Sequence, residues 1–194
     1  MDKVLYFKSL IRSHLGVNFI PDALDKFDNY DLIFSRIEDV DDLAKPSLVI
    51  PTNIPNPDAP KNITRLNFNN TIYTLYNKIQ KPNDDWRVIC HNNVPLWYHN
   101  ECGVIIPAWN YFSNIMDLLE FKEEKNTQVR DMHGRFLASQ SPYQLAGIGQ
   151  APVFNEFVSL LLSIIVGAGN KPELENLKNW VLPIKFVLSH DCDI

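Results

Sequence analysis

The sequence predicts an α/β protein in which helices flank a mixed sheet. Apolar residues recur at the three- and four-residue spacing of a helix in several segments. Between these segments lie short apolar runs that are rich in Val, Ile and aromatic residues and that end at Pro, Gly or polar residues. The two kinds of segment alternate along 194 residues, a length that suits one domain, or one domain and the start of another.

The helical segments show an apolar face and residues that start or stop a helix. Gly16 follows the first such segment, and Pro152 stands where the first turn of the longest apolar one begins. We expect helices at residues 3–15, 107–124, 152–166 and 172–180.

The strand segments are short, and prolines or polar runs separate them. Residues 51–60 hold four prolines and are expected to cross the surface as a loop. The acidic run 36–42 indicates a solvated turn or the start of a short helix, residues 91–102 indicate a connection, and residues 127–150 are irregular. We expect strands at 31–37, 47–50, 86–90, 103–106 and 184–188, and one or two strands, or a strand and a helix, within 65–79.

Composition argues against several classes of protein. The chain has 18 Lys and Arg against 23 Asp and Glu, so it lacks the basic excess that binds nucleic acids or anionic membranes. No apolar run is long enough to span a bilayer, and no signal peptide is recognisable. The three cysteines are an odd number, which does not indicate a disulfide framework. We therefore expect a cytoplasmic protein with neither a nucleic-acid nor a membrane partner.

The last residues of the chain combine an apolar strand with two carboxylates. The segment 184–188 runs directly into Ser189-His190-Asp191-Cys192-Asp193. Asp191 and Asp193 are two residues apart, so an extended backbone directs both side chains to one face. Two carboxylates placed in this way can bind a cation, or one can bind it while the other accepts a proton. The alternative is a polar chain end with two solvated acids.

Three motifs in the second half of the chain resemble the polysaccharide deacetylase family. Phe186-Val187-Leu188-Ser189-His190-Asp191-Cys192-Asp193 resembles the opening motif of its barrel of parallel strands. Asp131-Met132-His133-Gly134-Arg135-Phe136, and a helix start with Asn155 and Glu156 in Pro152-Val153-Phe154-Asn155-Glu156-Phe157, resemble an N-terminal domain that some members carry before the barrel. Leu118-Leu119 with Glu123-Glu124, Ala138-Ser139 and Tyr143-x-x-Ala146-Gly147 also resemble that domain, and the likeness covers residues 109–194.

The resemblance implies a division of the chain and roles for two residues. Residues 1–180 would be the N-terminal accessory α/β domain, and residues 181–194 the first strand and first motif of a deacetylase barrel. Asp191 would be the general base, and Asp193 would bind a divalent metal, zinc or similar, with two histidines of an H-x-x-x-H motif. This chain has no such motif.

The resemblance therefore implies a fragment cut just after the first catalytic motif. The rest of the barrel, which is the expected partner, would lie beyond Ile194. The complete protein would remove N-acetyl groups from a carbohydrate by metal-assisted hydrolysis, and this chain alone would be inactive. The alternative is a non-catalytic carbohydrate- or protein-binding module of bacterial origin. A self-standing enzyme of another type is the third possibility.

Two further groups of residues allow a binding interpretation and a structural one. Trp97, Tyr98 and Trp109 lie in an aromatic-rich stretch that either stacks on sugar rings or belongs to the core. Cys90, His91, His99 and Cys102 are zinc-type ligands, but only His99 and Cys102 have a usual spacing. The alternative is a buried cysteine, a surface histidine and coincidence.

The motif around His133 predicts a turn with a structural salt bridge. His133-Gly134-Arg135 places an arginine next to a glycine, and an arginine side chain binds carboxylates through two parallel hydrogen bonds. We expect Asp131, His133 and Arg135 to form a structural motif, with Arg135 bonded to Glu123, Glu124 or Glu156.

Overall fold

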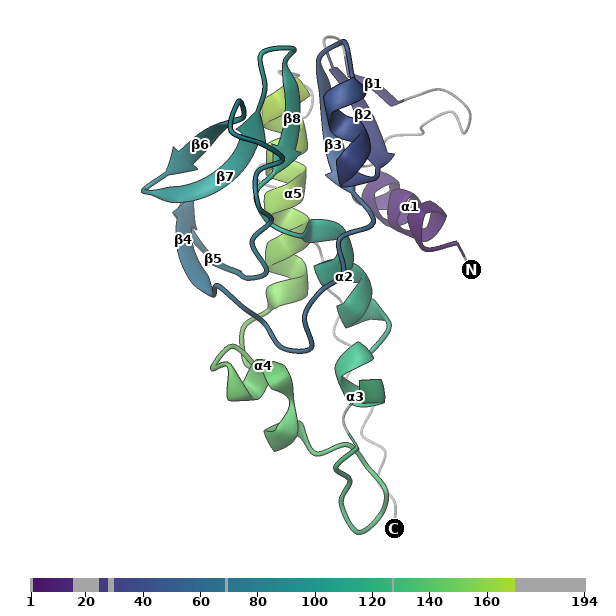
Figure 1. Ribbon diagram of the computed structural model, residues 1–194. Helices are drawn as coiled ribbons and strands as arrows, with labels where there is room; N and C mark the ends of the chain where they lie inside the picture. The colour runs from purple at the N-terminus through teal and green to yellow at the C-terminus, as the bar shows by residue number, and fades with distance from the viewer. Residues whose placement is uncertain (1, 16–24, 28–29, 69, 127, 170–194) are drawn as a thin grey trace.

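A six-stranded mixed sheet lies at the centre of the computed structural model, which describes residues 2–15, 25–27, 30–68, 70–126 and 128–169 (Figure 1). Strands β2, β3 and β8 run parallel, and β1, β7 and β6 pair antiparallel at the two sides. The sheet order is β1 (Asp25–Phe27), β2 (Tyr30–Ser35), β3 (Ser47–Pro51), β8 (Val104–Pro107), β7 (Val94–His99) and β6 (Arg87–His91). The predicted α/β class with a mixed sheet is confirmed.

Three longer helices, α1 (Lys3–Leu15), α2 (Tyr111–Leu119) and α5 (Val153–Gly169), pack against one another, and α2 also contacts β3 of the sheet. Helix α5 contacts α1, α2 and the strand β5 (Thr71–Leu75). Aromatic rings connect α1 with β2 and α2. The centroid of the buried Phe7 ring lies 5.8 Å from that of Phe34 and 5.1 Å from that of Phe112. No helix in the described ranges is both long and apolar enough to cross a membrane.

Strand β5 belongs to a second, two-stranded sheet with β4 (Thr64–Phe68). Segment 65–79, whose strand content was left open by the sequence, therefore contributes two strands of a hairpin. Leu66 and Leu75 are fully buried and anchor this hairpin on the core.

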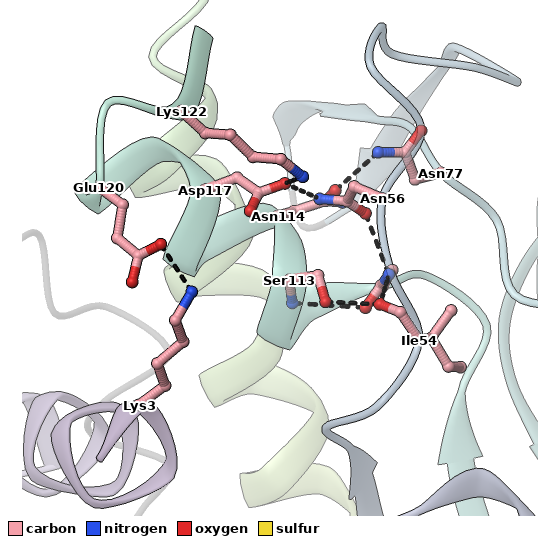
Figure 2. A network of polar contacts seen from close by, with 10 residues as sticks. Lys3, Ile54, Asn56, Asn77, Ser113, Asn114, Asp117, Glu120 and Lys122 are labelled. Carbon is pink, nitrogen blue, oxygen red and sulfur yellow. Dashed lines mark hydrogen bonds and ion pairs between the residues drawn. The ribbon is translucent and has the colours of Figure 1, made fainter. Parts of the chain in front are cut away.

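The proline-rich loop is held against α2 by a polar network (Figure 2). The Ile54 carbonyl accepts hydrogen bonds from the side chains of Asn110 at 2.9 Å and Ser113 at 2.6 Å. The Asn56 amide donates to Asp117 at 2.9 Å, and Lys122 forms an ion pair with the same carboxylate at 2.9 Å. Residues 52–63 contain no strand or helix, so the predicted loop is confirmed and has a fixed position.

The region predicted as one helix at 107–124 is three elements. Strand β8 continues to Pro107, and α2 starts only at Tyr111 because the Asn110 side chain caps it by accepting from the Ser113 amide. Phe121 adopts a positive φ of 53° and ends the first helix before α3 (Lys122–Asn126).

Residues 91–102, expected to be a connection, contain β7. The irregular stretch 127–150 includes the short helices η2 (Ala138–Gln140) and α4 (Pro142–Leu145), and the acidic run forms η1 (Ile37–Asp42). The predicted helix 172–180, the strand 184–188 and the boundary at 180/181 lie outside the described residues.

Candidate functional site

A pocket of about 360 Å³ lies between the end of α2, helix α3, the segment around α4 and the start of α5. Its apolar walls come from Leu118, Phe136, Ile148, Val153 and Phe154, among others. Its polar groups belong to Glu123, Ser141, Tyr143, Gln144 and Asn155. A concave site with an apolar lining and a few polar groups is the usual form of a small-molecule site.

Ser141 fixes the carboxylate of this pocket. Its hydroxyl donates a short hydrogen bond to Glu123 and accepts from the amides of Tyr143 at 3.2 Å and Gln144 at 3.5 Å. The two hydrogen bonds from the Tyr143 and Gln144 amides cap α4, in which Pro142 occupies the first turn. Glu123 is therefore held at the junction of α3 and α4, and among the described residues it forms no ion pair with a cation.

Tyr143 supplies a neutral phenol beside this carboxylate. Burial raises the pKa of Tyr143 to about 12, so the phenol is protonated at neutral pH. Its ring makes an edge contact with Tyr76, with the ring centroids 5.8 Å apart, and burial also raises the pKa of the Tyr76 phenol. Among the described residues that line the pocket, Glu123 is the one with a carboxylate side chain.

The first turn of α5 forms the opposite wall. The Glu156 amide donates to the Pro152 carbonyl at 3.0 Å, and the Val153 amide donates to Ala151 at 2.8 Å. The amides of Phe154 and Asn155 have no acceptor among the described residues, as is common for the first N–H groups of a helix. The Glu156 side chain points elsewhere, since its carboxylate accepts from the Thr74 amide of β5 at 2.6 Å.

Asp131, His133 and Arg135 form a closed turn next to the pocket. The Asp131 carboxylate accepts from the amides of His133 at 2.8 Å and Arg135 at 2.9 Å and from the Arg135 Nε at 2.8 Å. These contacts, the Arg135 amide first among them, lower the pKa of Asp131. Phe136 then enters the pocket lining.

The predicted partner of Arg135 was wrong. Arg135 pairs with Asp131, four residues earlier, at 2.8 Å rather than with Glu123, Glu124 or Glu156. The turn brings Asp131 to the guanidinium, whereas Glu123 and Glu156 are already bonded to Ser141 and Thr74. His133 is exposed, and Asn155 lines the pocket.

Two of the three aromatic residues considered for sugar binding, Tyr98 and Trp109, are buried. Tyr98 is 3% exposed and Trp109 is 2% exposed, so their rings cannot stack on a ligand at the surface. Their polar atoms are used inside the fold, because the Tyr98 hydroxyl donates to Ile79 and the Trp109 indole donates to Pro95. Trp97 is half-buried. Tyr98 and Trp109 therefore belong to the core.

The four zinc-type residues are not brought together. Cys90 pairs with Pro95 and His99 pairs with Arg87 across the β6–β7 hairpin. Arg87, the partner of His99, lies three residues from Cys90 along β6. Cys90 and His99 are therefore separated by roughly 10 Å along the strand direction. Cys102 lies in the turn after β7, which ends at His99. Cys90 is exposed, so the alternative of a buried cysteine is also wrong for this residue. No group of three or more His, Cys, Asp or Glu side chains in the described part of the chain could hold a metal ion.

Some site residues were missed, and others cannot be placed. Ser141, Gln144 and Tyr143 were not predicted to line a site, although Ser141-Pro142 is a recognisable helix start. Asp191 and Asp193 lie outside the described residues. Comparisons with protein-family models, with curated proteins and with solved structures gave no match to this chain.

Proposed function

We propose that this chain is the N-terminal accessory domain of a metal-dependent carbohydrate deacetylase. One observation supports this function most directly. Each of the described segments that resemble the family contributes to the same pocket, although they are spread from the end of α2 to the start of α5. These contributions come from Leu118, Glu123, Phe136, Ala138, Tyr143, Gln144, Pro152, Val153, Phe154 and Asn155.

In this proposal the domain packs on a deacetylase barrel and shapes or caps its substrate cleft. Asp191 is the proposed general base, and Asp193 is a proposed ligand of a divalent metal whose other ligands come from the barrel. No step of the hydrolysis is assigned to the described residues, whose pocket would position carbohydrate or face the barrel.

The reading frame that encodes this chain tests the proposal. We expect barrel strands and an H-x-x-x-H motif to be encoded after the codon for Ile194. A stop codon at that place would contradict the proposal. So would release of acetate from an N-acetylated sugar by residues 1–194 in the presence of added zinc, because the remaining metal ligands are then not needed.

A non-catalytic binding module is the second candidate. The observation that favours it is that described residues alone already supply a concave pocket with an apolar lining and a few polar groups. Carbohydrate binding without a barrel in the reading frame would support this candidate over the first.

A further inference from the structure

A second pocket, of about 410 Å³, lies between the proline-rich loop and the segment that follows β5. It is lined by the loop residues Ile54, Pro55 and Pro57 and by two lysines, Lys61 and Lys78, among others. We call it the lysine pocket. Its volume is within the usual range of small-molecule sites, and it shares no lining residue with the candidate site described above.

Backbone hydrogen bonds bring the two lysines to the same pocket. The Lys61 amide donates to the Asn77 side-chain carbonyl at 3.0 Å, and the Asn77 amide donates to the Lys61 carbonyl at 2.7 Å. Lys78 follows Asn77 directly, and the next amide, that of Ile79, donates to the Ala108 carbonyl at 2.9 Å. The main chain on both sides of the pocket is therefore fixed before any ligand binds.

The ammonium groups of the lysine pocket are free to bind a ligand, whereas its amide side chains are not. The Asn77 side chain donates to Asn114 at 2.9 Å, and that of Asn56 donates to Asp117 at 2.9 Å (Figure 2). Lys61 and Lys78 form no side-chain hydrogen bond or ion pair within the described ranges. The pocket thus presents two unpaired cations on a rigid wall.

The charge of this pocket differs from that of the chain as a whole. The net charge of the chain is −5, but no Asp or Glu is among the described residues that line the lysine pocket. Asp58 of the same loop lines an adjoining pocket instead, together with Asp117 and Lys122. Two cations without a counterion attract an anion, and they stabilise two negative charges better than one.

We propose that the lysine pocket binds a phosphate monoester. The phosphate oxygens accept from the ammonium groups of Lys61 and Lys78, and the organic part of the ligand contacts Pro55 and Pro57. A carboxylate offers similar oxygens with a single charge and is the weaker ligand. This inference does not rest on the proposed function, because the two sites have no residue in common.

The test is a titration of the complete, isotope-labelled chain followed by the NMR shifts of its backbone amides. The probes are phenyl phosphate and benzoate, which carry the same ring on different anions, at constant ionic strength and near neutral pH. A phosphate monoester carries close to two negative charges there. We expect phenyl phosphate to shift the Asn62 and Lys78 amides and to bind at least about fivefold more tightly than benzoate.

Three charge-matched variants test the role of the lysines. Lys61→Gln and Lys78→Gln should each weaken binding of phenyl phosphate about tenfold and that of benzoate less, so the preference for phosphate becomes smaller. Lys125→Gln removes the same charge from an exposed lysine of α3 that does not line the pocket and has no ion pair in the described part of the chain. It is expected to bind like the unaltered chain.

The unaltered chain alone can overturn the inference. Binding of phenyl phosphate no tighter than that of benzoate, or no shift at Asn62 and Lys78 with either probe, would do so even if a lysine variant fails to fold. Equal weakening by Lys125→Gln and Lys78→Gln would also overturn it, because the effect would then come from net charge. None of these results bears on the proposed deacetylase function.

Discussion

Asparagine occupies backbone positions that glycine fills in most proteins. Among the described residues other than glycine, a positive φ is found at Asn62, Asn70, Asn77, Asn92, Asn93 and Phe121. Asparagine tolerates this left-handed region better than other residues with a Cβ. At these five positions asparagine therefore supplies the left-handed conformation that a turn requires.

Two of these asparagines should respond differently to replacement by glycine. Asn77 is buried, accepts from the Lys61 amide at 3.0 Å and donates to Asn114 at 2.9 Å, whereas Asn92 lies in the exposed β6–β7 turn. We expect Asn77→Gly to lower the free energy of unfolding by about 2 kcal/mol through the lost hydrogen bonds. Asn92→Gly should change it by less than about 0.5 kcal/mol, because glycine suits this turn. Urea unfolding measures both, and equal losses would contradict the assignment.

Two buried tyrosines form a second matched pair. The Tyr111 hydroxyl is buried without a partner in the described part of the chain, whereas the Tyr98 hydroxyl donates to the Ile79 carbonyl at 2.9 Å. Tyr111→Phe is expected to leave the free energy of unfolding unchanged or to raise it by up to about 1 kcal/mol. Tyr98→Phe is expected to lower it by about 1 kcal/mol. Thermal or urea unfolding decides, and a larger loss for Tyr111→Phe would show that its hydroxyl has a partner.

At the scale of elements, β7 shows what a sequence pattern can hide. Pro95 lies inside this strand, and a proline normally argues against a central strand because it lacks an N–H donor. The structure accommodates Pro95 opposite a register shift between Ile89 and Cys90 of β6. Such a bulge depends on the partner strand, so it could not be predicted from residues 91–102 alone.

Strong local signals, by contrast, predicted their elements well. The helix at 3–15 and the strand at 47–50 agree closely with α1 and β3, because helical spacing and a buried apolar run are properties of the segment itself. The start of α2 was predicted four residues too early, since the apolar pattern continues from β8 into the helix and only the cap at Asn110 separates them.

Glu156 connects the start of α5 to β5 and should contribute to stability. Its carboxylate accepts from the amide of the buried Thr74 at 2.6 Å, and removal of the carboxylate leaves this donor unpaired. We expect Glu156→Ala to lower the free energy of unfolding by about 2 kcal/mol. Asn155→Ala, at the preceding position and without a side-chain bond in the described part of the chain, is the control and should cost less than about 0.5 kcal/mol. Equal losses in urea unfolding would contradict this role.

The turn at Asp131 should be stable to low pH. Its hydrogen bonds lower the pKa of Asp131, so their stabilisation is complete above the ordinary aspartate pKa of about 3.9 and is lost as the pH falls through the lowered value. NMR shifts of the His133 and Arg135 amides between neutral and strongly acidic pH should titrate with a midpoint below about 3.9. A midpoint at or above that value would show that the carboxylate does not accept these bonds. Asp131→Asn should remove the titration.

At the scale of the whole molecule, the candidate pocket could not be predicted although its motifs could. Resemblance singled out segments near Asp131 and Pro152 one by one. The pocket forms only where the end of α2 and the start of α5, distant in sequence, come together with the segment around α4. Burial of Tyr98 and Trp109 likewise depends on neighbours that no local pattern shows.

The fold also separates the pocket from the sheet. Helices α3 and α4 and the turn at 131–136 project from one end of the molecule, away from β1 and β6 (Figure 1). In the proposed deacetylase this end carries the resembling motifs, so it is the face on which carbohydrate or the barrel would be recognised.

The most direct measurement of the proposed function is acetate release from an N-acetylated oligosaccharide by the product of the complete reading frame, with and without Asp191→Asn. We expect metal-dependent release that Asp191→Asn lowers by about a hundredfold or more, because a general base contributes at least that much. No release by the complete product, or release that Asp191→Asn leaves unchanged, would contradict it.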